Sequence, residues 1–194
     1  MSKHHRNRNW APAPQPLPED AHVIDNHTHV ASVVPFSQAM SHEAMEKGQG
    51  EVPVYSVDEL LEQAQKVGVE GVIDCGCELP NLMTAIDMAR EHPGTVHAAI
   101  AIHPNEAVLH GHRGAPGPDG LPIKYKPWHD IPFDEAMAEV HRLATTYPNQ
   151  VVAIGETGMD LFRTGESAKE LQREAFRAHV ALAKELNLPM QIHD

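Results

Sequence analysis

The chain has 194 residues, of which 41% are hydrophobic, and a formal net charge of −12. This length and composition fit a soluble globular domain with a substantial core, and no apolar run approaches the roughly 18 residues that span a bilayer. The negative charge argues against a protein that coats nucleic acid, but not against an enzyme that binds one phosphate through metal ions.

The N-terminal segment is charged and then rich in proline. Residues 1–20 lack the apolar stretch of a secretory signal, so we expect a flexible tail. The two cysteines, Cys75 and Cys77, are one residue apart, and a disulfide across that spacing would be strained. Without a disulfide framework the default expectation is a cytoplasmic protein that does not associate with membranes.

Beyond the tail, apolar strand-like stretches alternate with amphipathic helical stretches. A first strand is predicted over residues 22–26, and residues 31–55 are expected to form a long mixed connection. Ser56 then opens a helix, with Glu59 completing a capping box. The further predicted elements are a strand over 69–75, a helix from Pro80 to before Pro93, a strand over 96–102, a helix over 133–148, a strand over 151–157, a helix from about Ser167 to Leu186 and a strand over 188–193.

Near-continuous apolar strands separated by amphipathic helices predict a parallel α/β sheet that is buried on both faces. Two architectures fit this pattern, an open doubly wound sheet and a (β/α)8 barrel. No Gly-rich phosphate loop follows any predicted strand, which disfavours a nucleotide-binding doubly wound fold. Residues 108–130 are rich in Gly, Pro and His, so no regular element is expected there.

Side chains suited to metal binding or catalysis lie at the C-terminal ends of four of the five predicted strands. They are His27 and His29 after the first strand, His103 after the third, Glu156 in the fourth and His193 in the fifth. Barrel enzymes build their active sites at the C-terminal ends of their strands. A random scatter of the 15 histidines would not favour those positions, so the pattern favours the barrel.

His27 and His29 are two residues apart on an extended segment, so both imidazoles lie on one side and can reach a single ion. Glu156 could bridge that ion to a second one held by His193. Imidazole and carboxylate ligands suit Zn²⁺, Mn²⁺ or Fe, with Mg²⁺ where carboxylate and water dominate. One or two such ions would activate a water molecule for displacement at phosphorus.

Each of these residues also has a simpler explanation. Glu156 could be a turn residue, His193 an ordinary strand-end histidine, and His103 the cap of the next helix. Cys75 and Cys77 are more simply explained as buried thiols than as ligands. The joint placement favours a metal site, because the simpler explanation must account for each residue separately.

Four motifs resemble, in order, those of the TatD-type metal-dependent hydrolases, which are often described as deoxyribonucleases. They are IDNHTH (24–29), AIHPNEA (101–107), AIGETGMD (153–160) and LQREAFRAHVALAKELNLPMQIHD (171–194). The resemblance spans about residues 21–194. It implies a (β/α)8 TIM barrel, of which this chain would hold about the first five βα units, with an insertion at about 108–130.

The resemblance also implies one or two divalent metal ions and phosphodiester hydrolysis, typically 3′ to 5′ from DNA ends. Carried over by position, His27 and His29 would bind the first metal, Glu156 would bridge both and His193 would bind the second. Glu156 and His103 would be the catalytic residues. Gly158 and Asp160 would shape the loop after the fourth strand.

Substrate contacts are expected from His103, Asn105, Arg113, Lys124 and Lys126. Asn105 stands where the family has a histidine, so its phosphate contact differs from the family pattern. A basic and aromatic loop within 108–130 could hold a nucleotide. An exposed insertion loop without that role is the equal alternative.

Three functions therefore compete. The first is a metal-dependent phosphodiesterase or deoxyribonuclease, and the second is another amidohydrolase-like barrel that cleaves a small amide, lactone or phosphoester. The third is a truncated metal-binding fragment without catalysis, because the family continues with three more βα units that supply a further His and Asp ligand.

Overall fold

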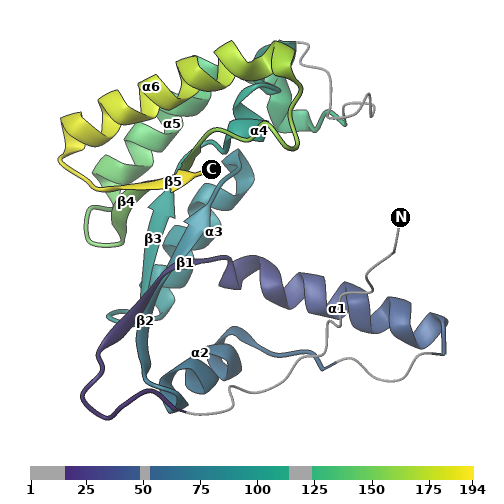
Figure 1. Cartoon of the computed structure of the whole chain (residues 1–194), viewed down its shortest axis with the longest axis vertical. Helices are drawn as coiled ribbons and strands as arrows, with labels where there is room; N and C mark the ends of the chain where they lie inside the picture. Colours follow the sequence, from purple (N-terminus) through teal and green to yellow (C-terminus); the bar gives the residue numbers. More distant parts are fainter. Residues whose placement is uncertain (1–15, 49–52, 114–123) are drawn as a thin grey trace. The chain divides into compact units, whose positions relative to one another are not determined.

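The computed structural model describes residues 16–48, 53–113 and 124–194. Its five strands form one sheet in the order β1-β2-β3-β4-β5 (Figure 1). The strands are β1 (Val23–Thr28), β2 (Val69–Gly76), β3 (Val96–Ile100), β4 (Val151–Gly158) and β5 (Met190–His193). The pairs β2–β3, β3–β4 and β4–β5 are all parallel, as the apolar strand pattern predicts.

Strands that are consecutive in the chain are also neighbours in the sheet. A doubly wound sheet reverses its strand order at a switch point, whereas a (β/α)8 barrel adds each strand beside the one before it. The observed order therefore selects the barrel-type architecture. The expectation of a barrel type represented by about five βα units is confirmed.

Helices connect the strands along the chain. They are α1 (Val30–Glu46), α2 (Val57–Lys66), α3 (Leu79–Glu91), α4 (Pro104–Ala107), α5 (Phe133–Thr146) and α6 (Lys169–Leu186), with short 3-10 turns η1 (His110–His112), η3 (Pro127–Asp130) and η4 (Glu166–Ala168). The predicted capping box of α2 is present, because Ser56 Oγ accepts from the Glu59 amide and the Glu59 carboxylate accepts from the Ser56 amide. Helix α3 packs against β3, and α6 packs against β4 and α5.

The expectation of a long mixed connection over residues 31–55 is wrong. Helix α1 covers Val30–Glu46 and contains Pro35, a residue that usually ends or kinks a helix. Of its side chains only Ser37 and Ala44 are buried, which matches the absence of a clear apolar stripe at helical spacing in the sequence. Because of the proline and the weak stripe, the sequence does not predict this helix.

The expectation that 108–130 holds no regular element is also corrected at both ends of that segment, where η1 and η3 form. Two buried histidines explain them. The His110 ring bonds the Ile131 carbonyl oxygen at 2.8 Å, and His129 Nε2 lies 2.7 Å from the Glu106 carboxylate. Residues 114–123 of the predicted insertion lie outside the described part of the chain, as do residues 1–15 of the predicted tail.

The described chain divides into two compact units. One takes in the described residues up to Ile24 together with Ser32–Glu70, and the other takes in Asp25–Ala31 together with Gly71–Asp194. All the predicted metal-site residues belong to the second unit. No helix among the described residues is long and apolar enough to cross a membrane.

Strands β4 and β5 approach closely because two glycines of β4 face β5. A Cβ atom at Gly155 would lie 2.5 Å from the Cβ of Gln191, and one at Gly158 would overlap the carbonyl oxygen of His193. Gly158 also has a φ of +147°, which L side chains rarely adopt. The glycines therefore allow β5 to bring His193 beside the end of β4.

Candidate metal centre

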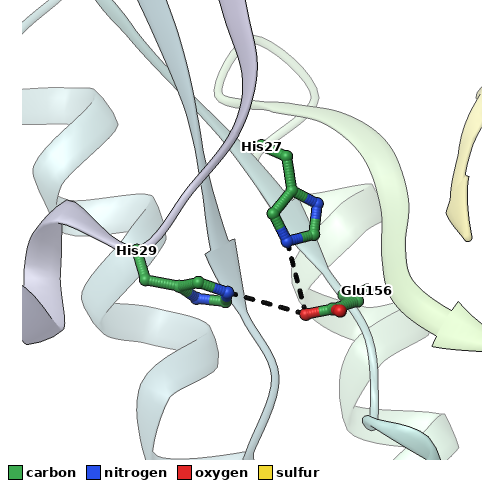
Figure 2. Close-up of side chains that lie close together, drawn as sticks. All are labelled: His27, His29 and Glu156. Atoms are coloured by element: carbon green, nitrogen blue, oxygen red, sulfur yellow. Dashed lines mark ion pairs between the residues drawn. The ribbon is translucent and has the colours of Figure 1, made fainter. Parts of the chain in front are cut away.

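The carboxylate of Glu156 lies at the centre of four histidines. Its Oε2 atom lies 3.5 Å from His27 Nε2 and 3.6 Å from His29 Nε2, and both rings point at that oxygen in Figure 2. Its Oε1 atom bonds His193 Nδ1 and lies 3.9 Å from His103 Nε2. The side chain of Glu156 is only 9% exposed, whereas those of His27 and His29 are 41% and 44% exposed. His27 and His29 thus lie on the solvent side of the buried carboxylate.

The two oxygens of Glu156 face two different histidine pairs. His27 and His29 with Glu156 form one group in which the ligand atoms lie within 4.8 Å of one another, and His103 and His193 with Glu156 form the other. Imidazole nitrogens and carboxylate oxygens are suitable donors for Zn²⁺, Mn²⁺ and Fe. The arrangement can therefore hold a divalent ion at either oxygen, with the same carboxylate between the two positions.

Glu156 is held in its ionised form by the histidines around it. Burial raises its pKa, but hydrogen bonds with His29 and His193 and the charges of His103 and His193 outweigh burial and lower the pKa to about 2. The same hydrogen bond raises the pKa of His29. A carboxylate that stays ionised at neutral pH is ready to bind a cation.

His103 presents a hydrogen-bond donor to this group. Its Nδ1 atom accepts a hydrogen bond from the backbone N–H of Asn105 at 3.2 Å, so in the neutral ring the proton is on Nε2. Burial lowers the pKa of His103, which favours the neutral ring. Nε2 is the atom nearest Glu156, so an N–H group faces the centre rather than a lone pair.

A second carboxylate, that of Asp160, holds His193 from its other side. Asp160 Oδ2 lies 3.3 Å from His193 Nε2, and Asp160 is only 5% exposed. The Asn105 side-chain amide donates to Asp160 Oδ2 at 2.7 Å, and its carbonyl oxygen accepts from the Thr164 hydroxyl. Asn105 is thereby joined to His193 through one shared carboxylate.

Two fully buried residues of α6, to which the sequence reading gave no role, support this framework. Gln172 accepts from the Asp160 backbone N–H at 2.9 Å and donates to the Asp160 carbonyl oxygen at 3.1 Å. His179 Nε2 accepts at 3.0 Å from the backbone N–H of Ile102, the residue before His103. Both lie on the apolar face of a predicted helix, and this position could have indicated that they bond to another part of the protein, since buried polar groups need partners.

The two cysteines act as thiol donors. Cys77 Sγ donates to Glu156 Oε2 at 3.7 Å, and Cys75 Sγ donates to Gln191 Oε1 at 2.8 Å. Burial and the nearby carboxylates raise the pKa of Cys75 to about 12 and also raise that of Cys77. Both thiols therefore stay protonated at neutral pH; Cys75 is buried, as interpreted from the sequence, whereas Cys77 is only partly buried.

The basic residues predicted as substrate contacts have other partners or are exposed in the described part of the chain. Both guanidinium nitrogens of Arg113 pair with Glu174 of α6, at 3.2 and 3.3 Å, and the group lies over the ring of Phe133. The backbone N–H of Lys126 donates to His129, and both Lys124 and Lys126 are exposed.

A barrel-type parallel sheet with histidines and a buried carboxylate at its strand ends is an arrangement found in metal-dependent hydrolases. The comparison with known families makes this specific. The model of the family described as "TatD related DNase" matches residues 24–194. The chain belongs to this family.

Two curated relatives illustrate the similarity. The chain is 32% identical over 138 residues to the uncharacterised metal-dependent hydrolase YabD of Bacillus subtilis, covering 71% of this chain and 44% of the relative. It is 32% identical over 136 residues to the 3′-5′ ssDNA/RNA exonuclease TatD of Erwinia tasmaniensis, covering 70% and 43%. The chain thus spans less than half the length of these relatives.

Two solved structures share the fold. A TatD family hydrolase from Entamoeba histolytica aligns with a TM-score of 0.60 at 20% identity, over 89% of this chain and 50% of its own. An uncharacterised amidohydrolase from Saccharomyces cerevisiae aligns with a TM-score of 0.58 at 16% identity, over 89% and 48%. At these identities the likeness establishes the fold alone.

Proposed function

We propose that this protein is a metal-dependent phosphodiesterase that removes nucleotides from the 3′ end of single-stranded nucleic acid, DNA in particular. The observation that carries the proposal is the position of the Glu156 carboxylate between two histidine pairs. The family membership supports it, as does the 3′-5′ ssDNA/RNA exonuclease named among the relatives.

In this proposal Glu156 would hold one divalent ion together with His27 and His29, and a second one together with His193. When bound, such ions would lower the pKa of an attacking water and neutralise charge on the phosphate. The donor set fits Zn²⁺, Mn²⁺ or Fe better than Mg²⁺, because imidazoles outnumber carboxylates.

His103 has a different role in this proposal, that of a catalytic donor. Its Nε2–H would donate to a phosphate oxygen, where negative charge builds up during displacement. The backbone N–H of Asn105 donates to Nδ1 and so holds the ring in the tautomer that this role needs. Asp160 would act as a positioning residue, since it orients His193 from outside the centre.

We also infer a cytoplasmic location, because both cysteines are free thiols. Disulfides persist mainly in oxidising compartments, so a protein with two unpaired thiols close to its reactive centre fits a reducing one. Immunodetection after cell fractionation tests this location.

The experiment is digestion of a 5′-labelled single-stranded oligonucleotide, followed on a denaturing gel. We expect stepwise shortening from the 3′ end, which stops on chelation and resumes with Mn²⁺ or Mg²⁺. Glu156→Gln should be inactive, whereas Glu170→Gln is a matched control, since Glu170 is an exposed residue that pairs with Arg173. Cleavage of small amides, lactones or phosphoesters without cleavage of the oligonucleotide would overturn the nuclease proposal in favour of another amidohydrolase-like activity.

A further inference from the structure

A cavity of about 420 Å³ lies beside His193. Its walls include Asp160, Leu161, Phe162, Arg163 and His193. Phe162 is 88% exposed, more than any other large hydrophobic side chain in the described part of the chain. An aromatic ring left in water beside a reactive centre is a feature of binding sites.

The backbone that carries Phe162 is fixed, although its side chain is exposed. Asp160 Oδ1 accepts hydrogen bonds from the backbone N–H groups of Phe162 at 3.1 Å and of Arg163 at 2.8 Å. Thr164, the next residue, is 4% exposed and donates to Asn105. The ring is therefore presented from a preorganised turn, which limits the entropy lost when a ligand binds.

The same carboxylate joins this turn to the proposed metal centre. Asp160 Oδ1 holds the turn, while its Oδ2 lies 3.3 Å from His193 Nε2. A ligand seated on Phe162 would thus lie beside a histidine that also bonds Glu156. Asp160 and His193 therefore connect the cavity to the proposed metal centre.

The chemistry of the cavity fits a nucleotide of a single strand. The Phe162 ring and the half-exposed Leu161 offer an apolar face on which a base can stack. The guanidinium of Arg163 is 3.7 Å from Asp160 Oδ2, and its side chain is 65% exposed, so it retains N–H groups for a phosphate. Asp194 also lines the cavity and would repel a phosphate, so the phosphate is expected on the Arg163 side.

We propose that Phe162 and Arg163 form a nucleotide subsite, in which the base beside the scissile phosphate stacks on Phe162 and Arg163 contacts the adjoining phosphate. This subsite rests on the proposed nuclease function and adds a substrate contact to it. A base inside a duplex has both faces covered by its neighbours, so the subsite favours single strands over the interior of a duplex.

The test is fluorescence anisotropy with a 5′-labelled single-stranded oligonucleotide in EDTA, so that binding is measured without hydrolysis. Phe162→Ala should raise the Kd roughly tenfold, the loss of one base stack, and Phe162→Trp should preserve binding. Arg163→Gln should weaken binding and lower the slope of log Kd against log salt by about 0.7, the loss of one phosphate contact to a single strand. Phe36→Ala is the matched control, because Phe36 is a 54% exposed phenylalanine of α1.

An oligonucleotide that lacks its 3′-terminal base separates stacking from a general effect. The missing base should weaken binding to the unaltered protein and cost little further in Phe162→Ala. An equal effect of the missing base in both proteins would overturn the subsite. So would a clear loss of thermal stability in Phe162→Ala, because it would mean that the ring packs against the protein.

The two proposals fail in different ways. If the unaltered protein digests the oligonucleotide but Phe162→Ala keeps its Kd and KM, the subsite is wrong and the nuclease function stands. If the unaltered protein neither binds nor digests single strands, the proposed function is wrong and the subsite falls with it.

Discussion

The side-chain amide of Asn105 donates a 2.7 Å hydrogen bond to the Asp160 oxygen that also lies 3.3 Å from His193 Nε2. Its carbonyl oxygen accepts from Thr164, so both ends of the amide are used inside the protein. A residue that follows β3 therefore acts on the histidine of β5 through one buried carboxylate. This connection favours a positioning role for Asn105 over the substrate contact expected from the sequence.

Asn105→Leu tests that connection, since leucine has a similar size and cannot bond to Asp160. We expect metal affinity at the position beside His193 to fall roughly 10- to 100-fold, the usual effect of losing an outer support. Substrate KM should change little. Titration calorimetry with Mn²⁺ measures the affinity, and the exposed Asn149→Leu serves as control. Unchanged metal affinity together with a raised KM would instead make Asn105 a substrate contact.

His103→Gln separates a donor from a ligand. Because the proton of the neutral ring is on Nε2, we expect the variant to keep its bound metal and lose roughly 100-fold or more in kcat. Metal content and turnover are measured on the same preparation. The exposed His42→Gln should match the unaltered protein in both. Loss of one metal ion in His103→Gln would show that His103 is a ligand.

Gly158→Ala tests the close approach of β4 and β5. The added Cβ would overlap the His193 carbonyl oxygen, so we expect the free energy of unfolding to fall by roughly 3 kcal/mol or more. Gly94→Ala is the matched control, because Gly94 also has a positive φ but has open space around its Cβ position. It should lose only about 1 kcal/mol. Equal losses in urea unfolding would mean that backbone strain alone, and not the clash, sets the cost.

His179 predicts a pH dependence of stability. Burial lowers the pKa of this fully buried ring from 6.5 to about 4, against an opposing hydrogen bond with the Ala175 carbonyl. Between these values the unfolded chain binds a proton that the folded chain excludes. The free energy of unfolding should therefore fall by about 3 kcal/mol as the pH drops from 6.5 towards 4.

His179→Gln should flatten this part of the stability curve, because glutamine does not titrate. Urea unfolding of the metal-free protein at several pH values between 4 and 7 measures the slope. The exposed His42→Gln should retain the full slope. A slope that is the same in His179→Gln and the unaltered protein would mean that other groups cause the acid sensitivity.

Local signals made most of the fold predictable. The capping box of Ser56 and Glu59 marks the start of α2, and Pro80 marks the first turn of α3. The apolar run that forms β3 is buried almost throughout, which is why its lack of alternation indicates a strand covered on both faces. Helix α1 was not predicted, because it contains Pro35, which usually ends a helix, and because its apolar residues form only a weak stripe.

The sequence predicts those residues of the candidate site that are common metal ligands at strand ends. It does not predict residues that act by hydrogen-bonding to other residues of the site. His27, His29 and His193 meet at Glu156 because parallel strands end at one edge of a sheet. Gln172 and His179 were missed, since a polar residue on a helix shows its role only when its distant partner is known. The same holds for the bond from Asn105 to Asp160.

The central claim is that Glu156 holds divalent metal together with His27, His29 and His193. Elemental analysis tests it most directly, on protein loaded with Zn²⁺ or Mn²⁺ and then desalted. The account predicts one or two metal ions per chain, a content well below one in Glu156→Gln, and no change in the exposed control Glu170→Gln. Equal metal content in Glu156→Gln and the unaltered protein would contradict it.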